Sequence, residues 1–102
     1  MVPDDRPWLC IEVDQAVLTR NLRMFRDLIS PPVRMMAVVK ADGYGHGLLL
    51  AARAFLTGGA DLLGVHSCAE ALALRQAGIT HPVLVLGPVS AGEAQAAAGT
   101  ST

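Results

Sequence analysis

The chain has 102 residues, of which 52% are apolar and 17% are charged. This composition is typical of a globular domain with a hydrophobic core and excludes a disordered chain. The net charge is −1 and aromatic residues make up 4%, so neither nucleic acid nor an anionic membrane is expected as the main partner.

Targeting and redox signals are sparse. No apolar run reaches the roughly 18 residues of a membrane-spanning helix, and no apolar stretch near Asp4 and Asp5 forms a signal peptide. The two cysteines, Cys10 and Cys68, match no metal-ligand or Cys-x-x-Cys spacing. We therefore expect no metal site, two free buried thiols and a cytoplasmic protein.

A strand and a helix are predicted before residue 35. Trp8 to Val13 carries the aromatic and β-branched residues of a strand. Asp14 then predicts an N-cap, and Ser30-Pro31-Pro32 ends the helix. The apolar stripe of this helix is expected to face the core: Leu18, Leu22, Phe25 and Ile29. The arginines on the opposite side are expected to be solvated: Arg20, Arg23 and Arg26.

From Met35 onward the sequence repeats a short apolar strand followed by a helix. Strands are predicted at about 35–40, 62–66 and 83–86, and helices at about 48–57, up to Ala77, and at 94–98. Two Ser-x-x-Glu capping boxes, Ser67/Glu70 and Ser90/Glu93, begin the later helices, and Gly58-Gly59 and Gly78 end the earlier ones. Continuous apolar strands between helices are typical of a parallel sheet covered on both faces.

The first of these strands ends in Lys40, and a glycine-rich turn follows within the stretch 36–47, MAVVKADGYGHG. Lys40 is the only lysine among eight basic residues, and Tyr44 is the only tyrosine. A lysine amine can be neutral when desolvated and can attack a carbonyl, whereas arginine stays charged. An arbitrary lysine would only solvate the strand end, so the surrounding motif decides between the two interpretations.

The stretch Val38 to Gly47 resembles the pyridoxal-phosphate signature of the alanine racemase family. The family usually has alanine where this chain has Gly43, a departure expected to loosen the turn without removing a functional group. Gly64 to Gly87 also resembles the family's second and third βα units. The resemblance begins at Trp8 and thus covers most of the chain.

The resemblance implies an α/β fold that is the N-terminal fragment of a (β/α)8 barrel of the triosephosphate isomerase type. Residues 1–34 would form a lead strand and helix, and residues 35–102 the first three βα units. A complete barrel needs about 250 residues, so we expect a longer parent protein. Its C-terminal β domain would include the strand Trp8–Val13.

The resemblance also implies the chemistry of the site. Lys40 would be the Schiff-base lysine for pyridoxal 5'-phosphate and a base at the substrate α-carbon. The Tyr44 hydroxyl would donate to the cofactor phosphate, although an aromatic ring packed over the barrel mouth is the alternative. His46 is expected to be a packed loop residue. Cofactor contacts of His66 and Leu86 stay open.

The implied function is that of an alanine racemase, which interconverts L- and D-alanine and supplies D-alanine for peptidoglycan. The parent would be a homodimer with shared active sites, in which a partner tyrosine is the second base. Two alternatives stay open: a non-catalytic pyridoxal-phosphate-binding protein, which would lack the continuation Ala41 to Gly47, and an inactive remnant of a racemase. The chain alone is expected to be inactive and poorly soluble.

Overall fold

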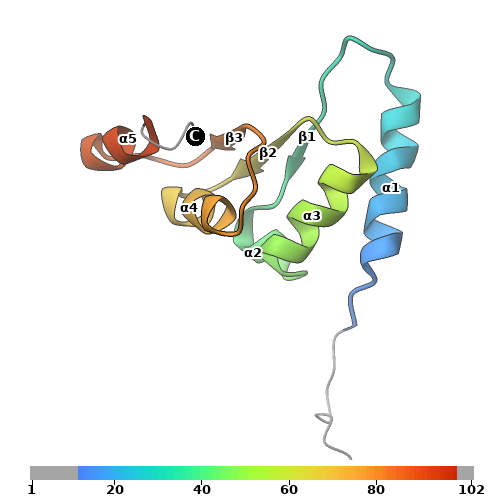
Figure 1. Ribbon diagram of the computed structural model, residues 1–102, viewed down its shortest axis with the longest axis horizontal. Helices are drawn as coiled ribbons and strands as arrows, with labels where there is room; N and C mark the ends of the chain where they lie inside the picture. The colour runs from blue at the N-terminus through green and yellow to red at the C-terminus, as the bar shows by residue number, and fades with distance from the viewer. Residues whose placement is uncertain (1–11, 99–102) are drawn as a thin grey trace, which may run out of the picture.

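The computed structural model describes residues 12–98 of the chain. In chain order the elements are α1 (Gln15–Leu28), β1 (Met36–Val38), α2 (Lys40–Tyr44), α3 (Leu48–Gly58), β2 (Leu62–Val65), α4 (Cys68–Gln76), β3 (Val83–Val85) and α5 (Ala91–Ala98). The strands form one parallel sheet in the order β1-β2-β3, as predicted. Figure 1 shows α3 and α4 along one side of this sheet, with α1 beside α3 and α5 beyond β3.

The predicted strand Trp8–Val13 lies largely outside the described residues. Glu12 and Val13, which are described, are not part of a strand. No described strand pairs with them, and an extended segment without a pairing partner forms no ladder. Within residues 12–98, no helix is long and apolar enough to cross a membrane.

Alternate residues of each strand point to opposite faces of the sheet, and the two faces differ. The buried positions pack with α3 and α4 around the core: Ala37, Val39, Leu63, Val65 and Val83. The other positions face away from these helices, and Leu84 and Leu86 there are 48% and 46% exposed. Within the described residues, therefore, only one face is covered, because three strands cannot close around the second face.

Helix α1 begins and ends as predicted but contacts little of the core. Asp14 Oδ1 accepts hydrogen bonds from the N–H groups of Ala16 and Val17 at 3.0 and 3.4 Å, which is an N-cap. Leu22 is buried, whereas Phe25 is 63% exposed, so the prediction that Phe25 faces the core is wrong. The reason is that α1 packs mainly on a single helix, α3. This contact covers only a narrow stripe of α1, and Phe25 lies outside that stripe.

Two of the arginines expected in solvent hold α1 in place. Arg23 Nη2 donates to the carbonyl oxygen of Thr57 at 3.0 Å. Arg26 Nη1 donates to Asp61 Oδ2 at 3.2 Å and to the carbonyl oxygen of Val33 at 2.9 Å. These guanidinium groups donate to carbonyl oxygens at the end of α3 and in the segment after α1. The polar face of α1 therefore also contacts the rest of the protein.

The ends of α3 and α4 follow the predicted signals. Gly59 (φ 112°) and Gly78 (φ 88°) have the left-handed backbone that glycine adopts at helix ends. Both capping boxes are formed. Helix α5 begins at Ala91, three residues before the predicted start, because its first turn follows directly after Ser90, the capping residue.

Candidate functional site

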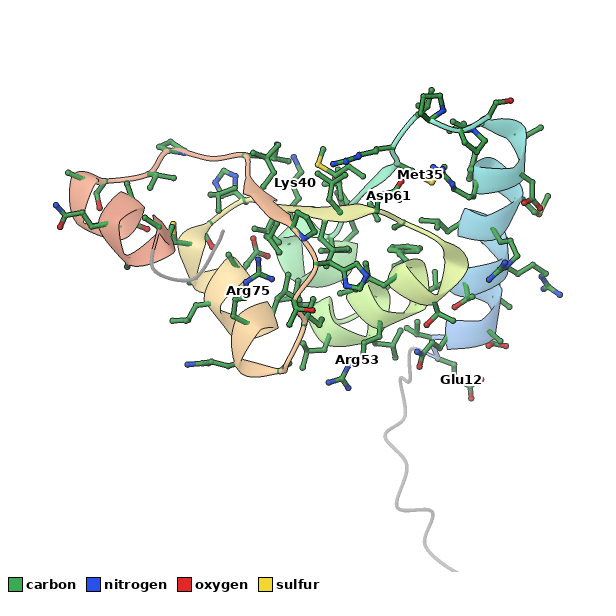
Figure 2. All side chains as sticks on the ribbon, turned by 45° about the horizontal axis from the view of Figure 1, so that its top comes forward. Glu12, Met35, Lys40, Arg53, Asp61 and Arg75 are labelled. Carbon is green, nitrogen blue, oxygen red and sulfur yellow. The ribbon has the colours of Figure 1, made fainter. Side chains whose placement is uncertain are left out.

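Lys40 stands where β1 ends. The ladder between β1 and β2 continues one residue past the strand, because the N–H of Val39 donates to the carbonyl oxygen of Gly64 at 2.8 Å. Lys40 follows at once as the first residue of α2 and is half-buried. Figure 2 shows Lys40 on one side of the sheet and Arg53, on α3, on the other.

The turn after Lys40 is left-handed. The φ/ψ angles are 54°/50° at Ala41, 55°/44° at Asp42 and 67°/33° at Gly43, and φ is 56° at Tyr44. A left-handed helical conformation costs an L-residue roughly 1–2 kcal/mol. Three of these four residues are not glycine, so the turn persists only if its surroundings hold it.

Asp42 is the centre of the hydrogen bonds within this turn. Its carbonyl oxygen accepts from the N–H of Gly47 at 2.8 Å, and its Oδ1 accepts from the N–H of Leu48, also at 2.8 Å. The side chain therefore caps the start of α3 from six residues away. This role of Asp42 was not predicted from the sequence, although an aspartate shortly before a helix start is a capping signal.

Gly43 is buried beneath the turn. A Cβ atom added there would lie 2.9 Å from Cβ of Ala51, which is closer than real side chains approach. The packing does not show the expected loosening of the turn. The space that a methyl group on Gly43 would need is already filled by Ala51 of α3.

The side chains of the outer turn face solvent. Tyr44 is 60% exposed, so its side chain is not packed into the described part of the chain. His46 is exposed as well, and the expectation that it is a packed loop residue is wrong. Its backbone N–H bonds to the carbonyl oxygen of Gly43 at 3.1 Å, so the backbone, not the imidazole, belongs to the turn.

The ends of β2 and β3 lie side by side next to this turn. Their ladder continues past the strands, since the N–H of Leu86 donates to the carbonyl oxygen of Val65 at 2.7 Å and that of Gly87 donates to the carbonyl oxygen of His66 at 2.9 Å. Between β1 and β2 the ladder stops at Val39, whose carbonyl oxygen accepts the N–H of Gly43 at 2.8 Å, while the N–H of His66 donates to Glu70 Oε1 at 2.9 Å. His66 and Leu86 are therefore neighbours at this end of the sheet, and Lys40 starts the turn beside them.

Apolar groups surround Gly64 in β2. A Cβ atom there would lie 3.1 Å from Sδ of Met36 and 3.4 Å from both Cγ2 of Val38 and Cδ1 of Leu86. His66 is exposed and lies over Gly87, where an added Cβ would come within 2.8 Å of its Nδ1. The face beside Lys40 is thus mostly apolar, with one imidazole at its end.

A cavity of about 290 Å³ lies elsewhere, between α4 and α5. Apolar side chains line it together with Cys68 and Glu93. Cys68 is a free, half-buried thiol whose pKa is raised by desolvation and then by the charge of Glu93. The pKa of Glu93 is lowered, chiefly by its hydrogen bonds to the backbone and side chain of Ser90. Cys10, the other predicted thiol, lies outside the described residues.

The Lys40 face fits a planar carbonyl cofactor better than a metal. One half-buried amine stands at the edge of an apolar surface, and an exposed tyrosine follows four residues later. Among residues 12–98, no group of three or more histidine, cysteine or carboxylate side chains could hold a metal ion. An amine can bond covalently to an aldehyde, and an apolar face can cover a ring.

Comparison with known proteins gives one answer. The model of the family described as "Alanine racemase, N-terminal domain" matches residues 13–101. The alanine racemase of Synechocystis sp. is 47% identical over 88 residues, and that of Symbiobacterium thermophilum is 49% identical over 85 residues. These matches cover 86% and 83% of this chain, but 23% and 22% of the relatives.

Solved structures agree. The alanine racemase of Bacillus anthracis with bound L-Ala-P superimposes with a TM-score of 0.84 at 39% identity, over 87% of this chain and 23% of that one. The enzyme of E. faecalis gives 0.84 at 33% identity, over 86% and 24%. The sheet and helices thus form part of the (β/α)8 barrel that the sequence predicted, and the chain belongs to the alanine racemase family, within its N-terminal domain.

Proposed function

We propose that this chain provides the lysine side of a pyridoxal 5'-phosphate site in a protein that interconverts L- and D-alanine. The observation that carries the proposal is the position of Lys40, the only lysine, at the end of β1 on the apolar face of the sheet. The continuation Ala41 to Gly47 supports a racemase over a non-catalytic cofactor-binding protein. The whole activity is a proposal, because the chain spans 23% of the first relative's length.

Two side chains would hold the cofactor. Neutral Lys40 Nζ would bond to the aldehyde carbon, and one water molecule would leave with the aldehyde oxygen. The Tyr44 hydroxyl would donate a hydrogen bond to a phosphate oxygen. When bound, pyridoxal phosphate withdraws electrons from the substrate α-carbon and makes its proton easier to remove. A neutral lysine amine on that face can accept such a proton at Nζ.

The remaining parts of the proposal come from the family. We infer a homodimer in which a partner tyrosine serves as the second base, alanine as the substrate, and D-alanine for peptidoglycan as the product. A cytoplasmic location is inferred with them. Tyr44 is the only tyrosine of this chain, so a tyrosine that serves as the second base must come from outside it.

Covalent attachment tests the role of Lys40. The chain is incubated with pyridoxal phosphate, reduced with borohydride and digested, and the labelled peptide is identified by mass spectrometry. We expect the label on the peptide that contains Lys40 and its loss in Lys40→Arg, which keeps the charge but cannot attack. A label that stays equally strong in Lys40→Arg would place the attachment at the terminal amine and refute the proposal.

Cofactor affinity tests the role of Tyr44. Tyr44→Phe removes the hydroxyl and keeps the exposed ring, so the fold should not change. Loss of one hydrogen bond to a charged group costs about 1.5–3 kcal/mol, which is about a tenfold or greater loss of affinity. Spectroscopic titration with pyridoxal phosphate measures it. Unchanged affinity would leave Tyr44 without a part in binding.

A further inference from the structure

Glu70, on α4, contacts the turn that follows Lys40. One carboxylate oxygen, Oε1, accepts the N–H groups of His66 at 2.9 Å and of Ser67 at 3.4 Å. The other oxygen, Oε2, accepts the N–H of Asp42 at 3.4 Å. The Glu70 carboxylate therefore completes the capping box of α4 and also connects the end of β2 with the left-handed turn.

The contact falls at the strained part of the molecule. Asp42 is the second residue of the left-handed run, and it is not glycine. Its carbonyl and side chain are bonded within the loop, to Gly47 and Leu48. Glu70 adds a contact from a different strand–helix unit, so it ties the turn to the rest of the sheet.

We propose that Glu70 is a positioning residue for Lys40: it holds the Asp42 amide, keeps residues 41–44 left-handed and so fixes the direction in which the amine leaves β1. The inference rests on the proposed attachment of pyridoxal phosphate to Lys40. Glu70 touches neither cofactor nor substrate in this proposal. It acts through the backbone of the turn.

The chain contains a matched control. Glu93 forms the same capping box with Ser90, at 3.2 Å in both directions, but lies at the start of α5 and faces Cys68 instead of the turn. Glutamine at this helix position still completes a capping box. In Glu70→Gln, however, one of the two acceptor positions becomes an N–H₂ donor whichever way the amide is oriented, so His66 or Asp42 loses its partner.

The experiment compares Glu70→Gln with Glu93→Gln in the full 102-residue chain. Hydrogen exchange of the peptide that spans residues 40–48 reports on the turn, and borohydride-trapped label on Lys40 reports on attachment of pyridoxal phosphate. We expect Glu70→Gln to raise exchange in that peptide and to weaken cofactor binding about three- to tenfold. Glu93→Gln should change neither. Ser67→Ala, which breaks the capping box and spares the Asp42 contact, should leave cofactor binding unchanged.

The outcomes separate this inference from the proposed function. Equal exchange and equal labelling in the two glutamine variants would overturn the role of Glu70 while Lys40 keeps its own. An effect of Ser67→Ala as large as that of Glu70→Gln would assign the effect to helix capping and would also overturn it. Absence of any label at Lys40 in the unsubstituted chain would refute the proposed function, and the positioning role would fall with it.

Discussion

The second and third strand–helix units, residues 62–76 and 83–98, carry the same local signals but differ in packing. Each has a short apolar strand, a serine N-cap and a glutamate three residues later. Helix α4 buries Ala71 and Leu74 against the sheet, whereas no residue of α5 is buried. Local signals therefore decide where each helix begins, and only the neighbouring elements decide whether it belongs to the core.

The capping glutamates differ in the same way. The second oxygen of Glu70 meets the Asp42 amide, in the turn after Lys40. Glu93 instead contacts the thiol of Cys68, and both side chains line the cavity between α4 and α5. The serine–glutamate pair thus caps a helix in both units. By our proposal, only the glutamate of the second unit, Glu70, also positions the turn after Lys40.

The largest effect is expected in the core of the second unit. Leu74 is fully buried, so Leu74→Ala should lower the free energy of unfolding by about 2–5 kcal/mol through lost burial and a cavity. Leu72, on the same helix, is 49% exposed, and Leu72→Ala should stay within about 0.5 kcal/mol. Urea denaturation measures both. Equal losses would mean that α4 is not packed as described, and the contrast with α5 would disappear.

Loss of the N-cap serine should separate the two units next. Ser67→Ala should lower the free energy of unfolding by about 1 kcal/mol, because α4 is part of the cooperative core. Ser90→Ala should leave the urea midpoint almost unchanged, since a helix without buried side chains can open by itself. Its effect should appear as faster hydrogen exchange in residues 91–98. A matching shift of the midpoint in Ser90→Ala would show that α5 unfolds together with the core.

The smallest effect concerns pH at the third unit. The pKa of Glu93 is lowered from its ordinary value of 4.5 by bonds from Ser90. A lowered folded-state pKa stabilises the helix start above the ordinary value, and this contribution is lost as the pH falls through the folded pKa. Exchange in residues 91–98 should therefore rise on acidification relative to the intrinsic rate. Glu93→Gln should remove that dependence, and a dependence retained in the variant would assign it to another group.

Much of the fold could be predicted because its signals are local. Asp14, Ser67 and Ser90 mark helix starts, and Gly59 and Gly78 mark ends, since capping and left-handed glycine depend on a few neighbouring residues. The parallel sheet followed from repeated apolar strands and helices. Phe25 and Arg26 were misjudged because helical periodicity identifies a face but not the element that the face meets.

The site divides in the same manner. The sequence by itself determined that Lys40 lies between a strand and a glycine-rich turn, because strand, lysine and glycines are adjacent in the chain. Only the tertiary structure decided that Ala41, Asp42 and Tyr44 are left-handed and that Glu70 reaches Asp42 across 28 residues. A left-handed turn at residues other than glycine has no local preference in its favour, so it depends on contacts from distant elements.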